Sequence, residues 1–403
     1  MNILVLNCGS SSIKYQVIDM TSSEDYKLLA KGLVERIGIE NGILTHRPTG
    51  KEQVKITTDI PDHTVGIDLI IKAITDPESG VIASLDELAA VGHRVVHGGE
   101  AFKESALIDE RVIATVEQYS EFAPLHIPAN LKGINAIKKL LPTVPQVANF
   151  DTAFHQTMPA KAFIYGLPYK YYEEYRVRKY GFHGTSHRFV AQQGAKLAGL
   201  DINNSKIITC HIGNGGSVTA IHNGKSVDTS MGFTPVDGLI MGTRCGYIDP
   251  GVISFIASKE NLSTAEWWDL INKSSGVAGM SGVSSDMRDV RTARDNGNER
   301  AALALEAYDY RIRKEVGAYA AAMGGVDLVV FTGGVGENDD ATRANVCGNM
   351  EFMGIEFDYE KNKGLRSTDA IISKEGSRCK VAAICTNEEL VIATDTFNIV
   401  SKM

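Results

Sequence analysis

Residues 207–221, IITCHIGNGGSVTAI, hold the pattern that decides the fold. A mostly apolar run leads into a turn with three glycines between His211 and Ser217, and an alternating apolar run follows. This pattern predicts a strand, a tight turn and a second strand. Glycine can take positive φ, and it lets a bulky anion approach the backbone N–H groups of the turn, which suits a phosphate group. One such turn is also typical of an ordinary hairpin.

The same plan occurs near the start of the chain. Residues 3–18, ILVLNCGSSSIKYQVI, contain an apolar strand, a small polar turn and a strand with Ile13, Tyr15 and Val17 on one face. Two such units, beginning at residues 3 and 207, predict a duplicated domain with a phosphate loop in each half.

Length and composition limit the class of protein. A chain of 403 residues exceeds what one hydrophobic core usually serves, so two domains are expected. With 43% apolar and 22% charged residues the composition is that of a globular protein. The formal charge of -8 does not favour nucleic acids or membranes as partners, since both select for basic surfaces. An anionic substrate would therefore need local arginines.

The cysteines and the N-terminus indicate a cytoplasmic protein. Six scattered cysteines without a CxxC pair predict reduced thiols rather than a zinc site or a disulfide framework. The N-terminus has no basic region and its apolar run stops at Asn7, so we expect no signal peptide. No apolar stretch approaches the roughly 18 residues that span a bilayer.

Further patterns place the remaining elements. Residues 146–150 predict a strand that delivers Asp151 at its C-terminal end, where α/β sheets usually carry reactive groups. Residues 180–188 predict a turn into a helix capped by Ser186. Residues 231–250 form a long loop with Arg244, and residues 332–338 make a third glycine turn after a strand. Because GxxxxGK[ST] and a convincing GxGxxG are absent, a P-loop enzyme and a Rossmann dehydrogenase are disfavoured.

Ten short motifs follow one another along the chain: NCGSSSIKY (7–15), GHRVVHGG (92–99), APLHIP (123–128), FDTAFH (150–155), YGFHGTSH (180–187), HIGNGGS (211–217), GTRCGYIDPG (242–251), SGVSSDMRD (281–289), FTGGVGEN (331–338) and TNEE (386–389). In this order they closely resemble the acetate kinase family, and the resemblance covers essentially the whole chain. It implies an α/β fold, the duplicated actin-like ATPase fold of sugar kinases, actin and heat-shock-70 proteins, with two domains around a nucleotide cleft. The implied domains are 1–150, with helix 387–403 packing back on it, and a nucleotide-binding domain at 151–386.

The resemblance also implies the reaction and its partners. The expected activity is reversible transfer of the ATP γ-phosphoryl to acetate, giving acetyl phosphate and ADP. The expected metal ion is Mg²⁺, with Mn²⁺ as an alternative, and the expected assembly is a cytoplasmic homodimer without nucleic-acid or membrane partners.

The chemistry requires positive charge more than a strong base. A carboxylate that attacks a phosphoryl group brings two anions together, and acetate is already ionised at neutral pH. By resemblance, Arg94 binds the carboxylate, while Arg244 and His183 stabilise the transferring group through planar or ring N–H donors. Asp151 matches the family's catalytic acidic residue, for which we expect an arginine-orienting or metal-proximal role. His126 matches an active-site histidine, and a purely structural role is its alternative.

The remaining site residues follow from the motifs. Acyl-length selectivity is expected from apolar neighbours of the arginine and histidine motifs: Val96, Leu125, Phe182 and Pro235. By resemblance, the expected metal positions are Asn7 and Glu388, the latter preferred over Glu389 because Thr386 and Glu389 have the spacing of a capping box that would occupy Glu389. The expected ATP contacts are Lys14, His211, Ile212, Gly213, Asn214, Gly215, Asp286, Met287, Arg288, Gly334, Val335, Gly336, Glu337 and Asn338.

The sequence leaves other functions open. A propionate or butyrate kinase of the same fold would be distinguished by assaying the three acids. A nonenzymatic nucleotide-gated clamp is a more distant alternative, because the chain offers no recognisable peptide-binding domain or polymer-forming insertion. A sugar kinase is disfavoured, since an acceptor site rich in arginine and histidine suits a small anion better than a polyol.

Overall fold

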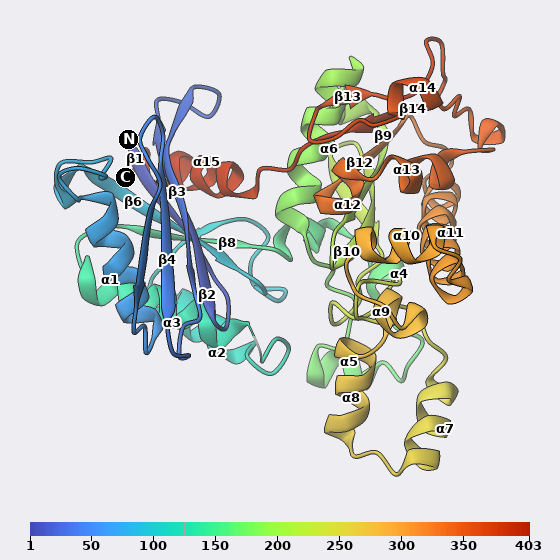
Figure 1. Cartoon of the computed structure of the whole chain (residues 1–403), viewed down its shortest axis with the longest axis horizontal. Helices are drawn as coiled ribbons and strands as arrows, with labels where there is room; N and C mark the ends of the chain where they lie inside the picture. The colour runs from blue at the N-terminus through green and yellow to red at the C-terminus, as the bar shows by residue number, and fades with distance from the viewer. Residues whose placement is uncertain (125) are drawn as a thin grey trace. The chain divides into compact units, whose positions relative to one another are not determined.

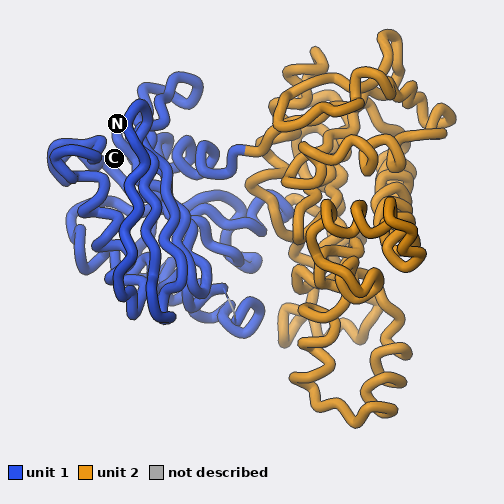
Figure 2. The backbone as a smooth tube through the Cα atoms, in the orientation of Figure 1, with its two compact units in different colours: residues 1–156, 387–403 blue, residues 157–386 orange. Residues whose placement is uncertain are grey.

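The computed structural model describes residues 1–124 and 126–403. The chain divides into two compact units (Figure 2). Unit 1 comprises Met1–Gln156 and Asn387–Met403, and unit 2 comprises Thr157–Thr386. Residues 151–156, with Asp151, are therefore part of unit 1.

Unit 1 is built on an eight-stranded sheet with the order β5-β4-β3-β2-β1-β6-β8-β7 (Figure 1). Strands β1, β6 and β8 are parallel to one another, and β2 and β3 continue the sheet in antiparallel pairing. The strands are β1 (Asn2–Cys8), β2 (Ser12–Met20), β3 (Tyr26–Glu35), β4 (Gly42–Pro48), β5 (Val54–Thr58), β6 (Leu88–Val95), β7 (Ala106–Leu107) and β8 (Gln146–Phe150).

Helices cover both faces of this sheet, so its inner strands are buried on both sides. A Cβ at Gly133 of α3 (Ile127–Leu140) would lie 2.5 Å from Cys8 Sγ, so α3 packs closely on β1. On the other face, a Cβ at Gly92 would lie 2.7 Å from Ile392 of α15 (Glu388–Val400). The remaining helices are α1 (His63–Ile74), α2 (Glu110–Gln118) and the 3-10 helices η1 (Leu85–Glu87) and η2 (Ala153–Thr157).

Unit 2 is built on a six-stranded sheet with the order β11-β10-β9-β12-β14-β13. Its first two strands confirm the hairpin predicted from residues 207–221. The strands are β9 (Lys206–Ile212), β10 (Gly216–His222), β11 (Lys225–Thr229), β12 (Leu328–Thr332), β13 (Ala370–Ile371) and β14 (Lys380–Ala383).

The two sheets share one plan. In unit 1, β3-β2-β1-β6-β8 has two antiparallel pairs followed by two parallel pairs, and β11-β10-β9-β12-β14 repeats this order and these directions. The expected α/β class and the duplication are confirmed.

The helices of unit 2 also lie on both faces of their sheet. Helix α6 (Gly184–Ala198) packs on β9 and β12, where a Cβ at Gly194 would lie 2.8 Å from Val330. Helix α11 (Glu299–Met323) joins the core that contains Ile208 and Cys210. The other helices are α4 (Ala160–Phe163), α5 (Lys170–Tyr175), α7 (Pro250–Glu260), α8 (Thr264–Lys273), α9 (Gly276–Ser281), α10 (Met287–Asp295), α12 (Gly333–Asn338), α13 (Asp340–Cys347), α14 (Tyr359–Asn362), η3 (Ile202–Asn204) and η4 (Glu351–Met353).

Two local predictions are wrong. Helix α6 begins at Gly184 with His183 as its N-cap, so Ser186 lies inside the helix and does not cap it. The glycines of the 213–216 turn do not take positive φ. They provide room instead, since a Cβ at Gly215 would lie 3.3 Å from Arg244 Nη1. Positive φ is used in the third glycine turn, at Gly333, where φ is 77°.

Candidate active site

Three predicted residues of unit 1 meet at one edge of its sheet. Asn7, Arg94 and Asp151 lie at or just beyond the carboxyl ends of β1, β6 and β8, and parallel strands bring these ends together. Arg94 Nε donates to Asp151 Oδ1 at 3.2 Å, and Arg94 Nη2 donates to Asp151 Oδ2. Arg94 Nη1 also lies 3.4 Å from the Asn7 amide oxygen. The guanidinium is therefore held by a two-point contact with a carboxylate.

Asp151 is completely buried, whereas the Arg94 side chain keeps 22% of its surface exposed. The backbone of Asp151 is fixed as well, because its N–H donates to Val95 O at 3.0 Å. Burial disfavours the charged guanidinium, but the negative charges of Asp151 and Glu388 outweigh it and raise the pKa of Arg94. Both Asp151 oxygens therefore contact the arginine.

Glu388 lies in the first turn of α15, in the same unit. Burial and the charge of Asp151 raise the pKa of Glu388 to about 7, while Arg94 and Lys14 act in the opposite direction. The capping box expected for Thr386 and Glu389 is wrong: Asn387 is the N-cap, and its side chain accepts from Leu390 N at 3.1 Å. Helix capping therefore gives no reason to prefer Glu388 over Glu389.

The other predicted residues of unit 1 differ in exposure. Val96 is 4% exposed, and its N–H donates to Asn130 Oδ1 at 3.0 Å. His126 is the residue that precedes α3. Leu125 lies outside the described residues. Lys14 is exposed on β2, directly opposite Asn7 of β1.

In unit 2, His183 and His187 pack against the β9–β10 hairpin, close to His211 of β9. His183 has a left-handed backbone with φ of 57°, and its Nδ1 lies 2.9 Å from Ser217 Oγ. Its ring stacks on His211 with 4.2 Å between ring centroids. His187 is fully buried and its two ring nitrogens contact Thr209 and Ser217, which is a structural arrangement. The strained backbone of His183 is therefore fixed by its neighbours.

Arg244, in the long loop at residues 231–250, lies close to Gly215, as does His183. A Cβ at Gly215 would lie 3.3 Å from Arg244 Nη1 and 3.8 Å from His183 Nε2. Arg244 Nη1 donates to Pro235 O at 3.3 Å, and Arg244 forms no ion pair with any residue that the structure describes. Burial lowers its pKa. A partly buried guanidinium without a carboxylate partner is suited to an anionic ligand. Phe182, which precedes His183, is 2% exposed.

A pocket of about 840 Å³ lies within unit 2, next to these residues. Its volume is in the range of cofactor pockets. The predicted ATP contacts that line it are Gly213, Asn214, Asp286, Met287, Arg288, Gly334, Val335 and Asn338. The turn at 213–216, the start of α10 and helix α12 are thus brought together around one pocket.

Some predicted ATP contacts do not line this pocket. Lys14 belongs to unit 1, and His211, Ile212, Gly215, Gly336 and Glu337 lie outside the pocket wall. The Glu337 carboxylate Oε1 accepts from Gly333 N and Thr386 N, both at 3.0 Å. The bond from Gly333 N satisfies the first N–H of α12, and the bond from Thr386 N ties α12 to the segment after β14.

The pocket wall also contains residues that the sequence prediction missed. They include Gly242, Ser285, Arg291, Tyr308, Asp339 and Arg366. Arg291 lies one helical turn after Arg288 on α10, so helical spacing from the predicted Arg288 would have identified it. Tyr308 and Arg366 are far from every glycine turn in sequence and carry no comparable signal.

No group of three or more histidine, cysteine, aspartate or glutamate side chains is arranged to hold a metal ion within residues 1–124 and 126–403. In the same described residues, no helix is both long and apolar enough to cross a bilayer.

The sequence model of the acetokinase family matches residues 2–394. The chain belongs to this family. An acetokinase relative, the acetate kinase of Desulfitobacterium hafniense, is 54% identical over 402 residues and is covered in full, as is this chain. The crystal structure of Porphyromonas gingivalis acetate kinase is 52% identical, with a TM-score of 0.95 over 99% of both chains. A propionate kinase from Francisella tularensis is 38% identical, with a TM-score of 0.90 over 98% of this chain and 99% of that one.

Proposed function

We propose that this chain is an acetate kinase, which transfers the γ-phosphoryl group of ATP to acetate and forms acetyl phosphate and ADP reversibly. The observation that carries the proposal is the full-length acetokinase match, together with a 54% identical acetate kinase that aligns from end to end. Propionate kinase is less well supported, because the propionate kinase structure is only 38% identical.

Unit 2 supplies the nucleotide-binding residues in this proposal. The 840 Å³ pocket accepts the nucleoside, and the backbone of the 213–216 turn lies beside it. Arg244 and His183 converge above Gly215, where they would donate hydrogen bonds to the phosphoryl group during transfer. Since these donors are already fixed by Pro235 and Ser217, little reorganisation is required at the moment of transfer.

Unit 1 supplies the acetate-binding arginine. Asp151 holds the Arg94 guanidinium in one orientation, and the planar fork of Arg94 can bind a carboxylate. Acetate carries no proton that must be removed at neutral pH. We therefore assign Asp151 to arginine orientation and His126 to substrate contact.

A magnesium ion fits the chemistry of unit 1. Around Arg94 and Lys14 lie three carboxylates, Asp151, Glu388 and Glu389, whose charges act on one another. Glu388 and the Asn7 amide would hold Mg²⁺, with Mn²⁺ as an alternative, because Mg²⁺ prefers oxygen ligands and needs only one or two from the protein. When bound with the nucleotide, the ion neutralises charge on the phosphate oxygens.

Selectivity for the acid is assigned to apolar residues beside the arginine and histidine motifs. Val96 and Phe182 are buried, Pro235 holds Arg244, and Leu125 completes the proposed set. A pocket of this kind discriminates one methylene by only about 1 to 3 kcal/mol. Propionate is therefore expected to be a slower substrate.

Domain roles, assembly and location complete the proposal. Unit 1 acts as the N-terminal actin-like domain and unit 2 as the actin-like nucleotide-binding domain.

We propose a homodimer, supported by the apolar helix α7, which has no buried residue and leaves Val252 and Phe255 42% and 63% exposed. Free cysteines, six in the described chain, support a cytoplasmic location.

The proposal is tested by trapping acyl phosphate with hydroxylamine, using acetate, propionate and butyrate as acids. Acetate should give the highest kcat/KM. Arg94→Ala should raise the KM for acetate, and Arg244→Ala should lower kcat by about 100-fold, since it removes a donor to the transferring group. Arg313→Ala is the control, because Arg313 lies outside the proposed site and donates to the carbonyls of Asn345 and Asn349.

ATP hydrolysis without dependence on any acid would reject the proposal in favour of a nucleotide-gated clamp. A higher kcat/KM for propionate or butyrate would assign the alternative kinase of the same family.

A further inference from the structure

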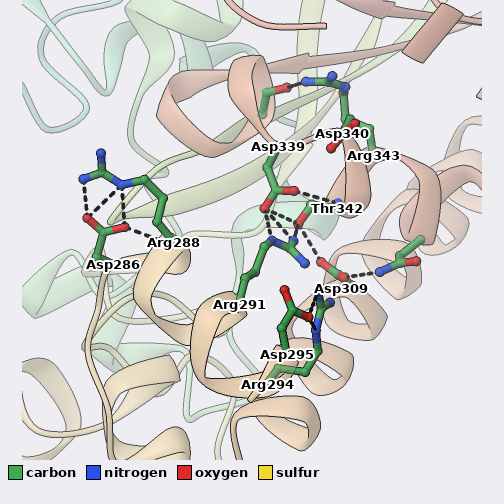
Figure 3. A network of polar contacts seen from close by, with 12 residues as sticks. Asp286, Arg288, Arg291, Arg294, Asp295, Asp309, Asp339, Asp340, Thr342 and Arg343 are labelled. Carbon is green, nitrogen blue, oxygen red and sulfur yellow. Dashed lines mark hydrogen bonds and ion pairs between the residues drawn. The ribbon is translucent and has the colours of Figure 1, made fainter. Parts of the chain in front are cut away.

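Two walls of the 840 Å³ pocket are joined by one ion pair. The first wall is α10 with its N-cap Asp286, and the second is α12 with the start of α13. Arg291 of α10 reaches across to Asp339, where α12 ends and α13 begins (Figure 3). Arg291 Nε donates to Asp339 Oδ2 at 2.7 Å, and Nη2 lies 2.5 Å from the same oxygen. The pair therefore connects elements that are separate in the chain.

Asp339 occupies the junction that fixes the glycine turn. It is the C-cap of α12, the helix that places Gly334, Val335 and Asn338 in the pocket wall. It is also the N-cap of α13, where its Oδ1 accepts from Thr342 N at 3.2 Å. A displacement of Asp339 would move the end of the glycine turn directly.

The ion pair is backed by a buried polar network. Arg291 Nη2 donates to Thr342 Oγ1 at 2.8 Å, and Thr342 Oγ1 lies 2.9 Å from Asp309 Oδ1. Asp309 Oδ2 accepts from Asn345 at 2.7 Å. The Arg291 and Asp339 side chains are only 17% and 13% exposed, so solvent screens their attraction less than that of a surface pair.

The other arginines of α10 form local pairs. Arg288 contacts Asp286, two residues away, and Arg294 contacts its neighbour Asp295. Both pairs leave the distance between α10 and α12 unconstrained. Within α10, Arg291 is the arginine whose ion pair reaches another element.

We propose that Arg291 is a positioning residue for the nucleotide: its ion pair with Asp339 holds α10 against the α12–α13 junction and so sets the affinity of the pocket for ATP and ADP. The proposal rests on the nucleotide-kinase function proposed above. It assigns no chemical step to Arg291, so catalysis after binding should be unaffected.

The test is a double-mutant cycle in the full-length chain. Arg291→Met removes the guanidinium and keeps much of the volume, and Asp339→Asn removes the charge while Asn still caps α13 well. Each single variant should raise the KM for ATP, and the Kd for ADP measured by calorimetry, about 10-fold, with kcat and the KM for acetate within about twofold of the original. In the double variant, the KM for ATP and the Kd for ADP should rise about 10-fold, as in each single variant, and not 100-fold. The reason is that both changes break the same contact.

Lys273→Met serves as the matched control, since Lys273 forms an exposed ion pair with Asp269 within α8. It should leave both KM values unchanged. Thermal unfolding without nucleotide measures any general loss of stability in each variant.

The proposal would be overturned if the folded Arg291→Met variant bound ADP as tightly as the original protein. It would also be overturned if the single-variant effects on ADP affinity multiplied in the double variant. A fall in kcat with constant nucleotide affinity would also contradict it. If instead the original protein makes no acetyl phosphate from ATP and acetate, the proposed function fails; ADP calorimetry on the variants then still decides whether the ion pair sets nucleotide affinity.

Discussion

At the residue scale, Glu388 carries a prediction about the metal ion. Its carboxylate lies among like charges, and a divalent cation bound there would favour the ionised form. Glu388→Gln should raise the Mg²⁺ concentration required for half-maximal activity by about 10-fold. The measurement is a magnesium titration of acetyl phosphate formation at fixed total ATP.

Glu389→Gln is the matched control, because Glu389 is the next residue in the same first turn. It should shift the magnesium requirement much less. Equal shifts in the two variants would mean that general negative charge, rather than ligation by Glu388, attracts the ion.

Asp309 carries a prediction about pH. Burial raises the pKa of Asp309 to about 6, although hydrogen bonds from Asn345 and Thr342 oppose this. Since the unfolded value is near 3.9, the folded state binds more protons between about pH 4 and pH 6, so this group's contribution to stability is lost as pH rises through that window. Asp309→Asn cannot ionise and should not show this loss. The melting temperature of the original protein, relative to Asp309→Asn, should therefore rise when the pH is lowered from 7 to 5.

Asp358→Asn provides the comparison for that experiment. Asp358 is a helix N-cap whose backbone hydrogen bond from Lys361 lowers its pKa, so it stays ionised across the same window. The difference in melting temperature between Asp358→Asn and the original protein should not change between pH 5 and 7. The interpretation of Asp309 is wrong if both variants respond alike.

At the element scale, the third glycine turn depends on backbone conformation. Gly333 has φ of 77°, and a Cβ there would lie 2.8 Å from Ile212 O of β9. Gly333→Ala should therefore destabilise the protein by about 1 to 3 kcal/mol and raise the KM for ATP, because strand β9 and α12 must separate. Melting temperature and ATP kinetics measure the two effects.

Gly317→Ala is the control for Gly333→Ala. Gly317 lies within α11, and nothing lies within 4 Å of a Cβ built there. This exchange should stabilise the helix, by up to about 1 kcal/mol. A Gly333→Ala variant with unchanged melting temperature would show that the turn can relax.

At the scale of the whole molecule, the apolar helix α7 predicts the assembly. Phe255 is 63% exposed on this helix, and a second copy of the chain would remove it from water. Phe255→Asp should convert the dimer into a monomer in sedimentation experiments at micromolar concentration. Phe352→Asp, at a 79% exposed phenylalanine of η4, should leave the dimer intact. A monomeric original protein would remove the dimer proposal.

Much of the fold could be predicted, because its signals are local. The β9–β10 hairpin, strand β8 before Asp151 and the third glycine turn after β12 follow from residue spacing alone. Helix starts were less predictable. His183 caps α6 in a left-handed conformation, and its contacts with Ser217 and His211, which come from distant parts of the chain, help to maintain this strained backbone.

The candidate site likewise combines features that the sequence predicts with features that it does not. Motifs placed Asn7, Arg94 and Asp151 in separate segments, and parallel strand ends bring them together. The hydrogen bonds that the Glu337 carboxylate accepts from Gly333 N and Thr386 N, by contrast, are not indicated by any motif.

By itself the sequence determined the duplicated α/β plan, the glycine turns and the acetokinase resemblance, because these depend on periodicity and short motifs. Only the tertiary structure decided which side chains share a partner. The Arg291–Asp339 pair joins residues 48 positions apart, and no local pattern encodes such a contact. Its geometry arises from the packing of α10 and the α12–α13 junction around one pocket.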